Sequence, residues 1–397
     1  MRDINKFKGC LLGGAVGDAL GYAVEFMHEP EIFAKYGPQG ITRYELHKGK
    51  ALISDDTQMT LFTAVGLLFG QTRGMLRGIG GDGCGFIRNA YLDWFDTQTR
   101  MFPYRPERMR VSWLADFEEF YHRRAPGMTC MSALEKGGWG TIENPINTSK
   151  GCGGVMRVAP IGLYFCDKEG WTEPEIDMVG ANAAAITHGH ALGYIPAAAL
   201  VHIVHSLASG KQRDIRQAVT DAVFAMPDLF PESREMLDFL LLMRMAVEFS
   251  QKDMDDLTAI HKLGKGWVAE ETLAIAVYCA LKYADDFEKA IVAAVNHSGD
   301  SDSTGAVTGN ILGAFLGVDA IPQCYLEALE LRDIIEEVAE DLYSDCQVDE
   351  DEECCDPVWD SKYAQADYDA QKREASTSPG WRETSAPKPY RNLRTLR

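Results

Sequence analysis

The chain has 397 residues, 46% of them hydrophobic, and a formal net charge of −20 at pH 7. This length and apolar content allow one large domain or two to three small ones with a sizeable core. The acidic excess argues against nucleic-acid binding through phosphates, because that mode needs a basic surface. It leaves room for a local pocket that binds a small anionic ligand.

The ten cysteines contain no C-x-x-C pair. Their spacing therefore suits neither a zinc ribbon nor a small disulfide scaffold, and reduced, buried thiols are expected. The short apolar run after Lys6 and Lys8 is interrupted by Asp18 and has no clean cleavage site, which disfavours a signal peptide. No run reaches the roughly 18 apolar residues of a membrane span. We therefore predict a cytoplasmic protein with no membrane partner.

Residues 7–26 predict an apolar helix with small residues along one face. Gly13, Gly17 and Gly21 recur every four residues, so they lie on the same side. Asp18 lies within this helix, either as a buried, hydrogen-bonded structural acid or as part of a site. Glu25 follows the helix, and we expect it in a loop that is free to move.

Residues 27–53 predict a loop with little regular structure. Ser54-Asp55-Asp56-Thr57 comes next and precedes an apolar helix from Met59 to Phe69. These oxygen-bearing side chains can cap the helix, with the acids favoured by its dipole. They can equally be ligands for a hard metal ion.

Residues 72–85 are rich in glycine and predict a loop. Two helices are expected after it, over residues 86–95 and 111–122, with prolines between and after them. The stretch Asn147–Arg157 is again rich in glycine and carries two cations. Exposed N–H groups in such a loop can cradle a phosphate, although a plain turn explains the same composition. Its spacing matches neither a Walker loop nor a dinucleotide fingerprint.

Residues 176–208 are rich in alanine and contain Thr187-His188-Gly189-His190. Both histidines can be satisfied core residues or ligands. Further helices are expected over residues 215–224, 233–249, 272–283 and 287–295. Strand alternation is rare throughout, so the pattern predicts an all-α protein.

The stretch Asn296–Gly305 places two carboxylates one residue apart, with hydroxyls beside them, before a helix. Gly305, Gly309, Gly313 and Gly317 repeat every four residues along that helix. Each glycine costs a helix about 1 kcal/mol against alanine, so such a face indicates another backbone very close by. The glycine face of residues 13–21 is the natural partner.

The two acidic helix starts together supply six hard oxygen ligands and no Cys or His. The set suits Mg²⁺, Mn²⁺ or Ca²⁺ rather than zinc. Four carboxylates held close together repel one another strongly without a cation, and they have room for two ions. The six candidate ligands are Ser54, Asp55, Asp56, Asp300, Asp302 and Ser303.

After Leu342 the composition changes. Residues 349–353 form an acidic run, and the polar stretch 366–397 is predicted to be disordered.

Together these stretches resemble the ADP-ribosylglycohydrolase family, which includes the dinitrogenase reductase-activating glycohydrolases. The resemblance is spread over residues 5–365 and so is specific. It rests on Gly13–Gly21 with Glu25, Ser54–Thr57, Gly151–Pro160, Thr187-His188, Gly299–Ala306, Trp359 and Lys362-Tyr363.

The resemblance implies an all-α, compact orthogonal helical bundle with a two-magnesium centre in a cleft, and places the metal on the six ligands above. Ser54 and Ser303 stand where threonine is common, and both keep the oxygen ligand. It implies that His188 lies near the phosphate and ribose of the substrate. Glu25 matches a glutamate on the loop that gates the cleft in some members of the family. The resemblance also implies one domain over residues 1–365. The diphosphate is expected on the loop formed by Gly151, Cys152, Gly153, Gly154, Val155 and Met156.

The implied reaction is hydrolysis of an N- or O-glycosidic bond at ribose C1″, which reverses ADP-ribosylation of a protein or small molecule. The catalytic candidates are Asp55, Asp56, Asp302 and Glu25. Two alternatives stay open: a protein that binds ADP-ribose or blocks an ADP-ribosyltransferase toxin, and a metal-dependent phosphoesterase acting on nucleotides.

Overall fold

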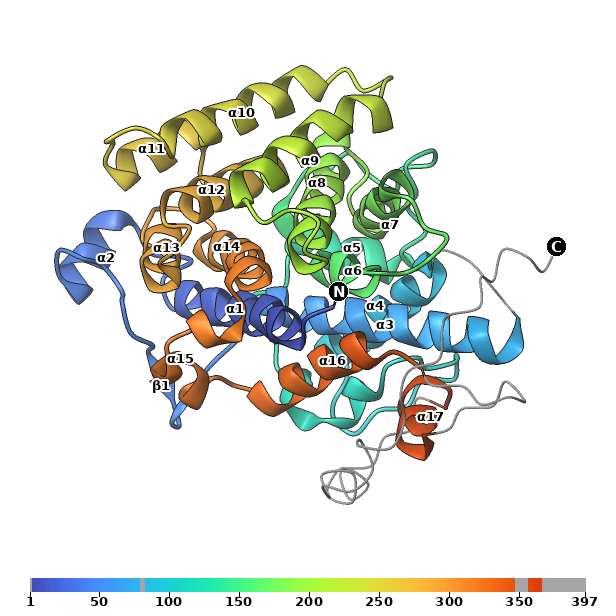
Figure 1. Ribbon diagram of the computed structural model, residues 1–397. Coiled ribbons are helices and arrows are strands. Elements are labelled where there is room, and N and C mark those ends of the chain that lie inside the picture. Colours follow the sequence, from blue (N-terminus) through green and yellow to red (C-terminus); the bar gives the residue numbers. More distant parts are fainter. Residues whose placement is uncertain (1, 79–82, 347–355, 366–397) are drawn as a thin grey trace.

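Helices make up most of the fold, and the all-α prediction is confirmed (Figure 1). The computed structural model describes residues 2–78, 83–346 and 356–365. The helices are α1 (Ile4–Tyr22), α2 (Glu29–Tyr36), α3 (Asp55–Arg77), α4 (Cys84–Thr99), α5 (Met128–Glu135), α6 (Ala159–Tyr164), α7 (Glu173–Ala185), α8 (Ala191–Ala208), α9 (Ile215–Leu229), α10 (Met236–Phe249), α11 (Asp256–Leu263), α12 (Ala269–Lys282), α13 (Phe287–Val295), α14 (Ser301–Leu316), α15 (Gln323–Ala328), α16 (Arg332–Ser344) and α17 (Pro357–Tyr363). Short 3-10 helices are η1 (Trp113–Asp116), η2 (Glu118–Tyr121), η3 (Cys152–Gly154) and η4 (Val318–Ala320), and β1 (Leu46–His47) pairs with β2 (Lys50–Ala51) in an antiparallel hairpin.

The two glycine-faced helices, α1 and α14, pack antiparallel at the centre of the fold (Figure 1). A Cβ added to Gly309 would lie 1.9 Å from the carbonyl oxygen of Gly13, and one added to Gly17 would lie 2.0 Å from that of Gly305. Backbone therefore meets backbone with no room for a side chain, which explains the glycine repeats. The predicted pairing is confirmed. Gly317 lies just beyond α14 as its C-cap, at φ 84°, rather than inside the helix.

This pairing decides where the acidic residues lie. Because the helices are antiparallel, the end of α1 meets the beginning of α14, and Gly21 lies against the backbone of Ser301. Glu25 follows α1 by three residues and so reaches the N-terminus of α14. Residues almost 300 positions apart in sequence are thereby held together by a rigid contact.

Other helices pack around this central pair and share its core. The buried apolar side chains of the described residues form one core cluster, which extends in sequence from Phe7 to Tyr363. Near the C-terminal end of the described residues, α17 is held against α3 by a 3.0 Å hydrogen bond from Trp359 Nε1 to Thr72 Oγ1. The buried Lys362 ammonium pairs with Asp341 of α16.

One core helix, α8, has the length and hydropathy of a membrane span, which the sequence analysis did not anticipate. Within the fold 89% of that helix window is buried. A buried core helix passes the same test of length and composition, so the pattern carries little weight.

Three predictions of local structure were wrong. Within residues 27–53, expected to be irregular, α2 forms on a capping box between His28 and Glu31, and the β1–β2 hairpin follows. A helix of eight residues is too short to show a clear apolar period. The helix expected over residues 111–122 is instead irregular chain with the two 3-10 turns η1 and η2. A loop was also expected over residues 72–85, but most of these residues are helical, because α3 continues to Arg77 and α4 begins at Cys84.

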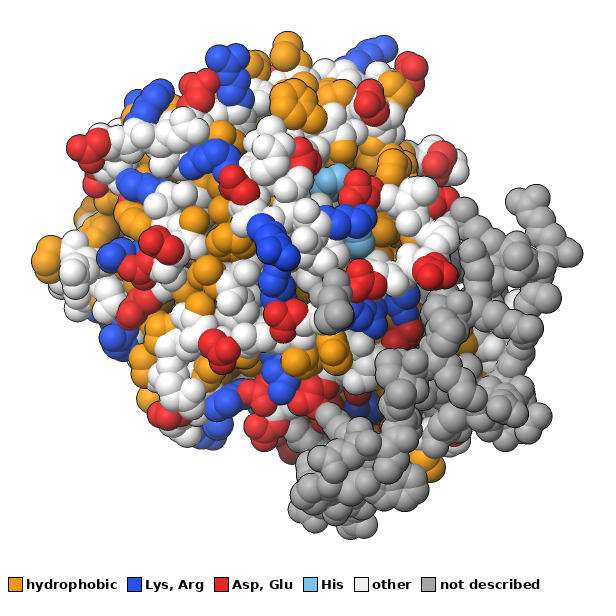
Figure 2. Space-filling model, in the orientation of Figure 1, with side chains coloured by type: hydrophobic (Ala, Val, Ile, Leu, Met, Phe, Trp, Pro, Cys, Tyr) orange, Lys and Arg blue, Asp and Glu red, His pale blue; other side chains and the backbone are white. Residues whose placement is uncertain are grey.

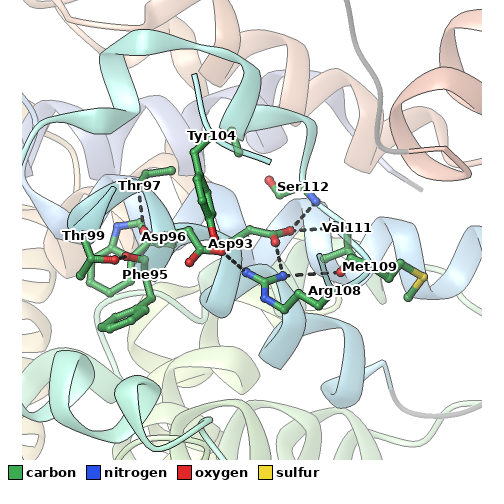
Figure 3. A network of polar contacts seen from close by, with 12 residues as sticks. Asp93, Phe95, Asp96, Thr97, Thr99, Tyr104, Arg108, Met109, Val111 and Ser112 are labelled. Carbon is green, nitrogen blue, oxygen red and sulfur yellow. Dashed lines mark hydrogen bonds and ion pairs between the residues drawn. The ribbon is translucent and has the colours of Figure 1, made fainter. Parts of the chain in front are cut away.

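A buried carboxylate explains why the helix over residues 111–122 does not form. Asp93 of α4 accepts hydrogen bonds from the backbone N–H groups of Val111 and Ser112, at 2.8 and 2.9 Å, and is paired with Arg108 (Figure 3). Arg108 also contacts Asp96 one turn later. The chain is thus tied to α4 in an extended course, and from there it runs to the candidate site.

Charged side chains of both signs are mixed on the face drawn in Figure 2, where Lys and Arg lie among Asp and Glu without gathering into one basic patch. Six cysteines of the described part of the chain are free thiols: Cys10, Cys130, Cys152, Cys166, Cys279 and Cys324. The acidic run 349–353, the tail 366–397 and the cysteines Cys354 and Cys355 lie outside the described residues.

Candidate metal centre

Three carboxylates from the two ends of the chain converge at the start of α14. Glu25, Asp300 and Asp302 are buried, and each offers an oxygen within 4.8 Å of the others. The α1–α14 contact brings Glu25 to this point, and Asp300 is the N-cap of α14. The backbone N–H of Asp300 is fixed by a 2.8 Å hydrogen bond to the carbonyl of Lys265.

The N-terminus of α3 adds the second group of oxygen atoms. The Ser303 hydroxyl of α14 donates to both carboxylate oxygens of Asp56, at 2.9 and 3.0 Å. Ser54 caps α3 by accepting the Asp56 N–H at 3.2 Å. Capping and site formation are therefore not alternatives here: Ser54 caps α3 and at the same time lies beside the cluster.

Asp55 is oriented from the irregular segment that Asp93 anchors. Its backbone N–H donates to the carbonyl of Arg124 at 3.0 Å, and its Oδ2 accepts the N–H of Gly127 at 3.1 Å. Sequence reasoning missed both contacts, because nothing in the composition around Gly127 marks it as a site residue.

Asp18 is a structural acid that holds the beginning of α3 in place. The carboxylate is fully buried and accepts the N–H groups of Ser54 and Thr57, at 2.9 and 3.1 Å, together with the Thr57 hydroxyl. This settles the open alternative for Asp18 in favour of a hydrogen-bonded structural role.

Burial raises the pKa of every carboxyl in this cluster, and repulsion between the acids raises it further for all of them except Asp302. The pKa of Glu25 rises to about 10, first through burial and then through the charges of Asp302 and Asp300. Burial, followed by the charge of Asp302, raises the pKa of Asp18 to about 7. For the same two reasons the pKa values of Asp55, Asp56 and Asp300 lie well above the usual range of aspartate, and burial raises that of Asp302.

Two oxygen atoms of the cluster show that it suits a cation. Within the part of the chain that the structure describes, no donor reaches Oε2 of Glu25 or Oδ2 of Asp300, although both atoms are buried. A buried carboxylate oxygen without a hydrogen bond is costly unless a positive charge compensates it. Carboxylates and hydroxyls without nitrogen or sulfur are the ligands that Mg²⁺, Mn²⁺ and Ca²⁺ prefer. The residues present therefore fit a hard divalent ion.

The glycine-rich loop lies next to this cluster. The sulfur of Met156, in this loop, lies 3.8 Å from the Ser303 hydroxyl of the cluster. Burial, then the charges of Asp300 and Asp56, raises the pKa of the Cys152 thiol. The loop backbone turns through η3, and the Cys152 N–H donates to the carbonyl of Trp267 at 3.3 Å. The first N–H groups of such a turn have no partner inside the helix, so those of Gly153 and Gly154 are suited to an anion.

Neither cation of the loop has its charge free for that anion. The Lys150 ammonium is paired with Glu270, and the Arg157 guanidinium is fully buried. A ligand on the loop would therefore be held by backbone N–H groups rather than by these side chains.

His188 lies against the same loop. A Cβ added to Gly151 would lie 3.4 Å from Nε2 of His188, and one added to Gly153 would lie 3.0 Å from its Cε1. The segment is fastened by Asn147, which donates to the carbonyl of Thr187 at 2.7 Å and accepts the N–H of Gly189 at 3.2 Å. His190 instead caps α8 by accepting the N–H of Leu192 at 3.1 Å, a structural role.

The structure thus brings together two groups of predicted residues, the acidic cluster and the glycine loop with His188. The predictions did not count Glu25 among metal ligands, yet it shares a triad with Asp300 and Asp302. The glycine repeats of α1 were the signal for this, because their pairing with α14 fixes where Glu25 lies.

Comparisons with known proteins point to one family. A family model described as ADP-ribosylglycohydrolase matches residues 1–352. An uncharacterized protein of Archaeoglobus fulgidus is 30% identical, over 85% of this chain and 96% of its own length. The ADP-ribosylarginine hydrolase Tri1 of Serratia proteamaculans is 26% identical, over 86% of this chain and 79% of its own. A solved structure described as an ADP-ribosylglycohydrolase-related protein complex has a TM-score of 0.56 and 26% identity, covering 86% of this chain and 98% of its own.

Proposed function

The chain belongs to the ADP-ribosylglycohydrolase family, and from this membership we propose that it is a magnesium-dependent hydrolase that releases ADP-ribose from modified proteins or small molecules. The family match and the hydrolase among its relatives support action on ADP-ribosylated substrates. The metal requirement and the catalytic roles below are our proposal.

The convergence of Glu25, Asp300 and Asp302 on one buried point carries the proposal. Unpaired, buried carboxylate oxygens are expensive to maintain, and a divalent cation is the simplest compensation. We assign two Mg²⁺ ions, with Mn²⁺ as a substitute, to the side chains around this point. These ligands are Ser54, Asp55, Asp56, Asp300, Asp302 and Ser303, with Glu25 as the further carboxylate of the triad.

The loop Gly151–Met156 would hold the diphosphate through its N–H groups, with His188 beside it. The distal ribose of the substrate would then lie over the acidic cluster, because Met156 of the loop contacts the Ser303 hydroxyl at 3.8 Å. When bound, the cations supply positive charge that orients sugar hydroxyls and eases loss of a proton from water.

A carboxylate of Asp55, Asp56 or Asp302 would accept the proton of the attacking water at C1″, where the glycosidic bond breaks. Glu25 would position the substrate or act as an acid or base, because it reaches the cluster from the turn after α1. The hydrogen bond from the Gly127 N–H fixes the orientation of the Asp55 carboxylate, so this group would be in position before the substrate binds.

Three other expectations remain predictions from the sequence: a cytoplasmic location, one domain over residues 1–365, and the absence of nucleic-acid and membrane partners. The alternative of an ADP-ribose-binding or toxin-blocking protein gains no support from the relatives reported above. The experiment below tests it directly.

Product analysis tests the proposal. The purified protein is incubated with Mg²⁺ and either arginine-linked or serine-linked ADP-ribosyl peptides, and the products are separated. We expect free ADP-ribose from one of the two substrates, lost in EDTA and in Asp302→Ala. The matched control is Asp214→Ala, which removes an exposed aspartate cap from α9 and should retain activity.

Other products would contradict the proposal. Inorganic phosphate or AMP instead of ADP-ribose would make the protein a phosphoesterase. Tight ADP-ribose binding without any turnover would make it a binding or blocking protein. Full turnover by Asp302→Ala would reject the two-metal site.

A further inference from the structure

Arg157 is a fully buried guanidinium, and no carboxylate of the described residues forms an ion pair with it. It donates to the carbonyl of Ala183 at 3.1 Å and to the Thr187 hydroxyl at 2.8 Å. Its charge lies over the Tyr91 ring, 4.1 Å from the centroid. A buried, permanently charged group held only by neutral partners is expensive, which suggests that the position has a use beyond packing.

Thr187 passes the effect of this charge to His188. Its hydroxyl oxygen accepts a hydrogen bond from Arg157, since a guanidinium can only donate. The same oxygen lies 2.8 Å from Nδ1 of His188. A hydroxyl that accepts from a cation becomes a stronger donor and a weaker acceptor. Thr187 therefore donates a hydrogen bond to Nδ1, and the ring proton of His188 lies on Nε2.

The other possible acceptor near Thr187 is weak. The Cys130 sulfur lies beside Thr187 and 3.4 Å from Nη1 of Arg157. A thiol is a poor acceptor compared with an imidazole nitrogen, so His188 accepts the hydrogen bond from the Thr187 hydroxyl. Burial, followed by the charge of Arg157, also lowers the pKa of His188 to about 3. The ring is thus neutral, with a single N–H.

We propose that Arg157 and Thr187 are positioning residues that hold His188 as its Nε2–H tautomer, so that the ring donates a hydrogen bond at the glycine loop and does not act as a base there. The Nε2 edge lies against Gly151 and Gly153, the part of the loop where an anionic ligand would be bound. A phosphate or ribose oxygen accepts hydrogen bonds, so the tautomer selects this class of ligand. The ligand part rests on the proposed function, whereas the tautomer does not.

Nitrogen NMR of protein labelled with ¹⁵N-histidine tests the tautomer without any turnover. The full chain at neutral pH should show His188 with its proton on Nε2 and a bare Nδ1. In Thr187→Val, which keeps the shape and removes the hydroxyl, a population with the proton on Nδ1 should appear. Thr187→Ser keeps the hydroxyl and should restore the parent spectrum.

Binding of ADP-ribose, measured by calorimetry on the same three proteins, tests the use of the tautomer. We expect Thr187→Val to bind about 10-fold more weakly, as for loss of one hydrogen bond to a charged acceptor. Thr187→Ser should bind like the parent. A parent spectrum with the proton on Nδ1, or a Thr187→Val variant unchanged in both spectrum and affinity, would overturn the inference.

The two proposals fail in different ways. A parent protein that does not bind ADP-ribose contradicts the proposed function, while its histidine spectrum still decides the tautomer. Should Thr187→Val fold poorly, Arg157→Lys offers a second variant: it keeps the charge but loses the planar fork, and it should likewise add the Nδ1–H population.

Discussion

Burial decides the protonation state of a histidine far from the candidate site as well. His205 of α8 is buried, lies 3.3 Å from the Lys211 ammonium through Nε2, and contacts the carbonyl of Gly162 through Nδ1. Burial, followed by the charge of Lys211, lowers its pKa to about 4. A neutral ring that accepts from Lys211 and donates to Gly162 fits both contacts, whereas a protonated ring would place two cations together.

The sign of the resulting pH dependence follows from linkage. The unfolded chain protonates His205 near its ordinary pKa of about 6.5, while the folded protein does so only near 4. The unfolded state therefore binds more protons in this window, and stability falls as the pH drops through it. Between pH 6.5 and 4.5, we expect His205→Gln to lose about 2 kcal/mol less unfolding free energy than the parent. Urea unfolding at several pH values measures this, and equal slopes for the two proteins would contradict it.

Single residues divide clearly into those that sequence could predict and those that it could not. Asp55, Asp56, Asp300 and Asp302 stand out because acids and hydroxyls cluster at helix starts, a local signal. The Gly127 N–H that orients Asp55 is a backbone contact between distant segments, and backbone groups leave no trace in residue type. For Thr187 the residue type was visible, but its contact with Arg157 depends on tertiary packing.

At the scale of elements, the backbones of α1 and α14 are in direct contact along their glycine faces. Their glycines allow carbonyl groups of one helix to lie where side chains of the other would be. Four-residue spacing of small residues was enough to predict the pairing, because that spacing places them on one face. Sequence could not predict that residues 111–122 avoid a helix, since the reason is the distant carboxylate of Asp93.

The glycines of this contact should tolerate no side chain. In Gly309→Ala, the new methyl group would lie 1.9 Å from the carbonyl oxygen of Gly13, and neither backbone can yield easily. We expect a loss of about 3 kcal/mol or more of unfolding free energy, at the upper end of overpacking effects. Thermal unfolding followed by circular dichroism measures it.

Gly85 provides the matched control for this change. It also lies in a helix, α4, but a Cβ there would meet no atom of the described residues within 4 Å. Gly85→Ala should be neutral or stabilising by up to about 1 kcal/mol, as expected for helix propensity. Similar losses in both variants would show that backbone proximity is not the reason for the glycine repeats.

At the scale of the whole molecule, the candidate centre depends on the complete fold. Its side chains come from the turn after α1, the start of α3 and the start of α14. An unfolded chain cannot present them together, so the proposed divalent ion would bind the folded state selectively. The acids also repel one another without the ion, which weakens the metal-free protein.

Metal should therefore stabilise the protein, and the added unfolding free energy should rise with the logarithm of the metal concentration above the dissociation constant. With Mg²⁺ at 100 times its dissociation constant, we expect about 2.7 kcal/mol of added unfolding free energy, and EDTA should reverse it. Differential scanning calorimetry with and without Mg²⁺ measures the shift in melting temperature. In Asp302→Ala the shift should disappear, whereas Asp214→Ala should keep it. A parent protein indifferent to Mg²⁺, Mn²⁺ and EDTA would contradict a metal centre.

The central pairing of α1 with α14 also has a consequence for synthesis on the ribosome. The first helix emerges early, with its glycine face uncovered, and its partner emerges only after most of the chain has been translated. Until then the carbonyl groups along that face have no helix beside them, and a nascent chain has one half of the acidic cluster without the other. Contacts between residues so far apart in sequence form slowly. The uncovered face of α1 must therefore be kept from associating with other chains until α14 has been translated. A stalled or truncated translation product that ends before Asp300 would thus lack both the central packing and the candidate metal centre.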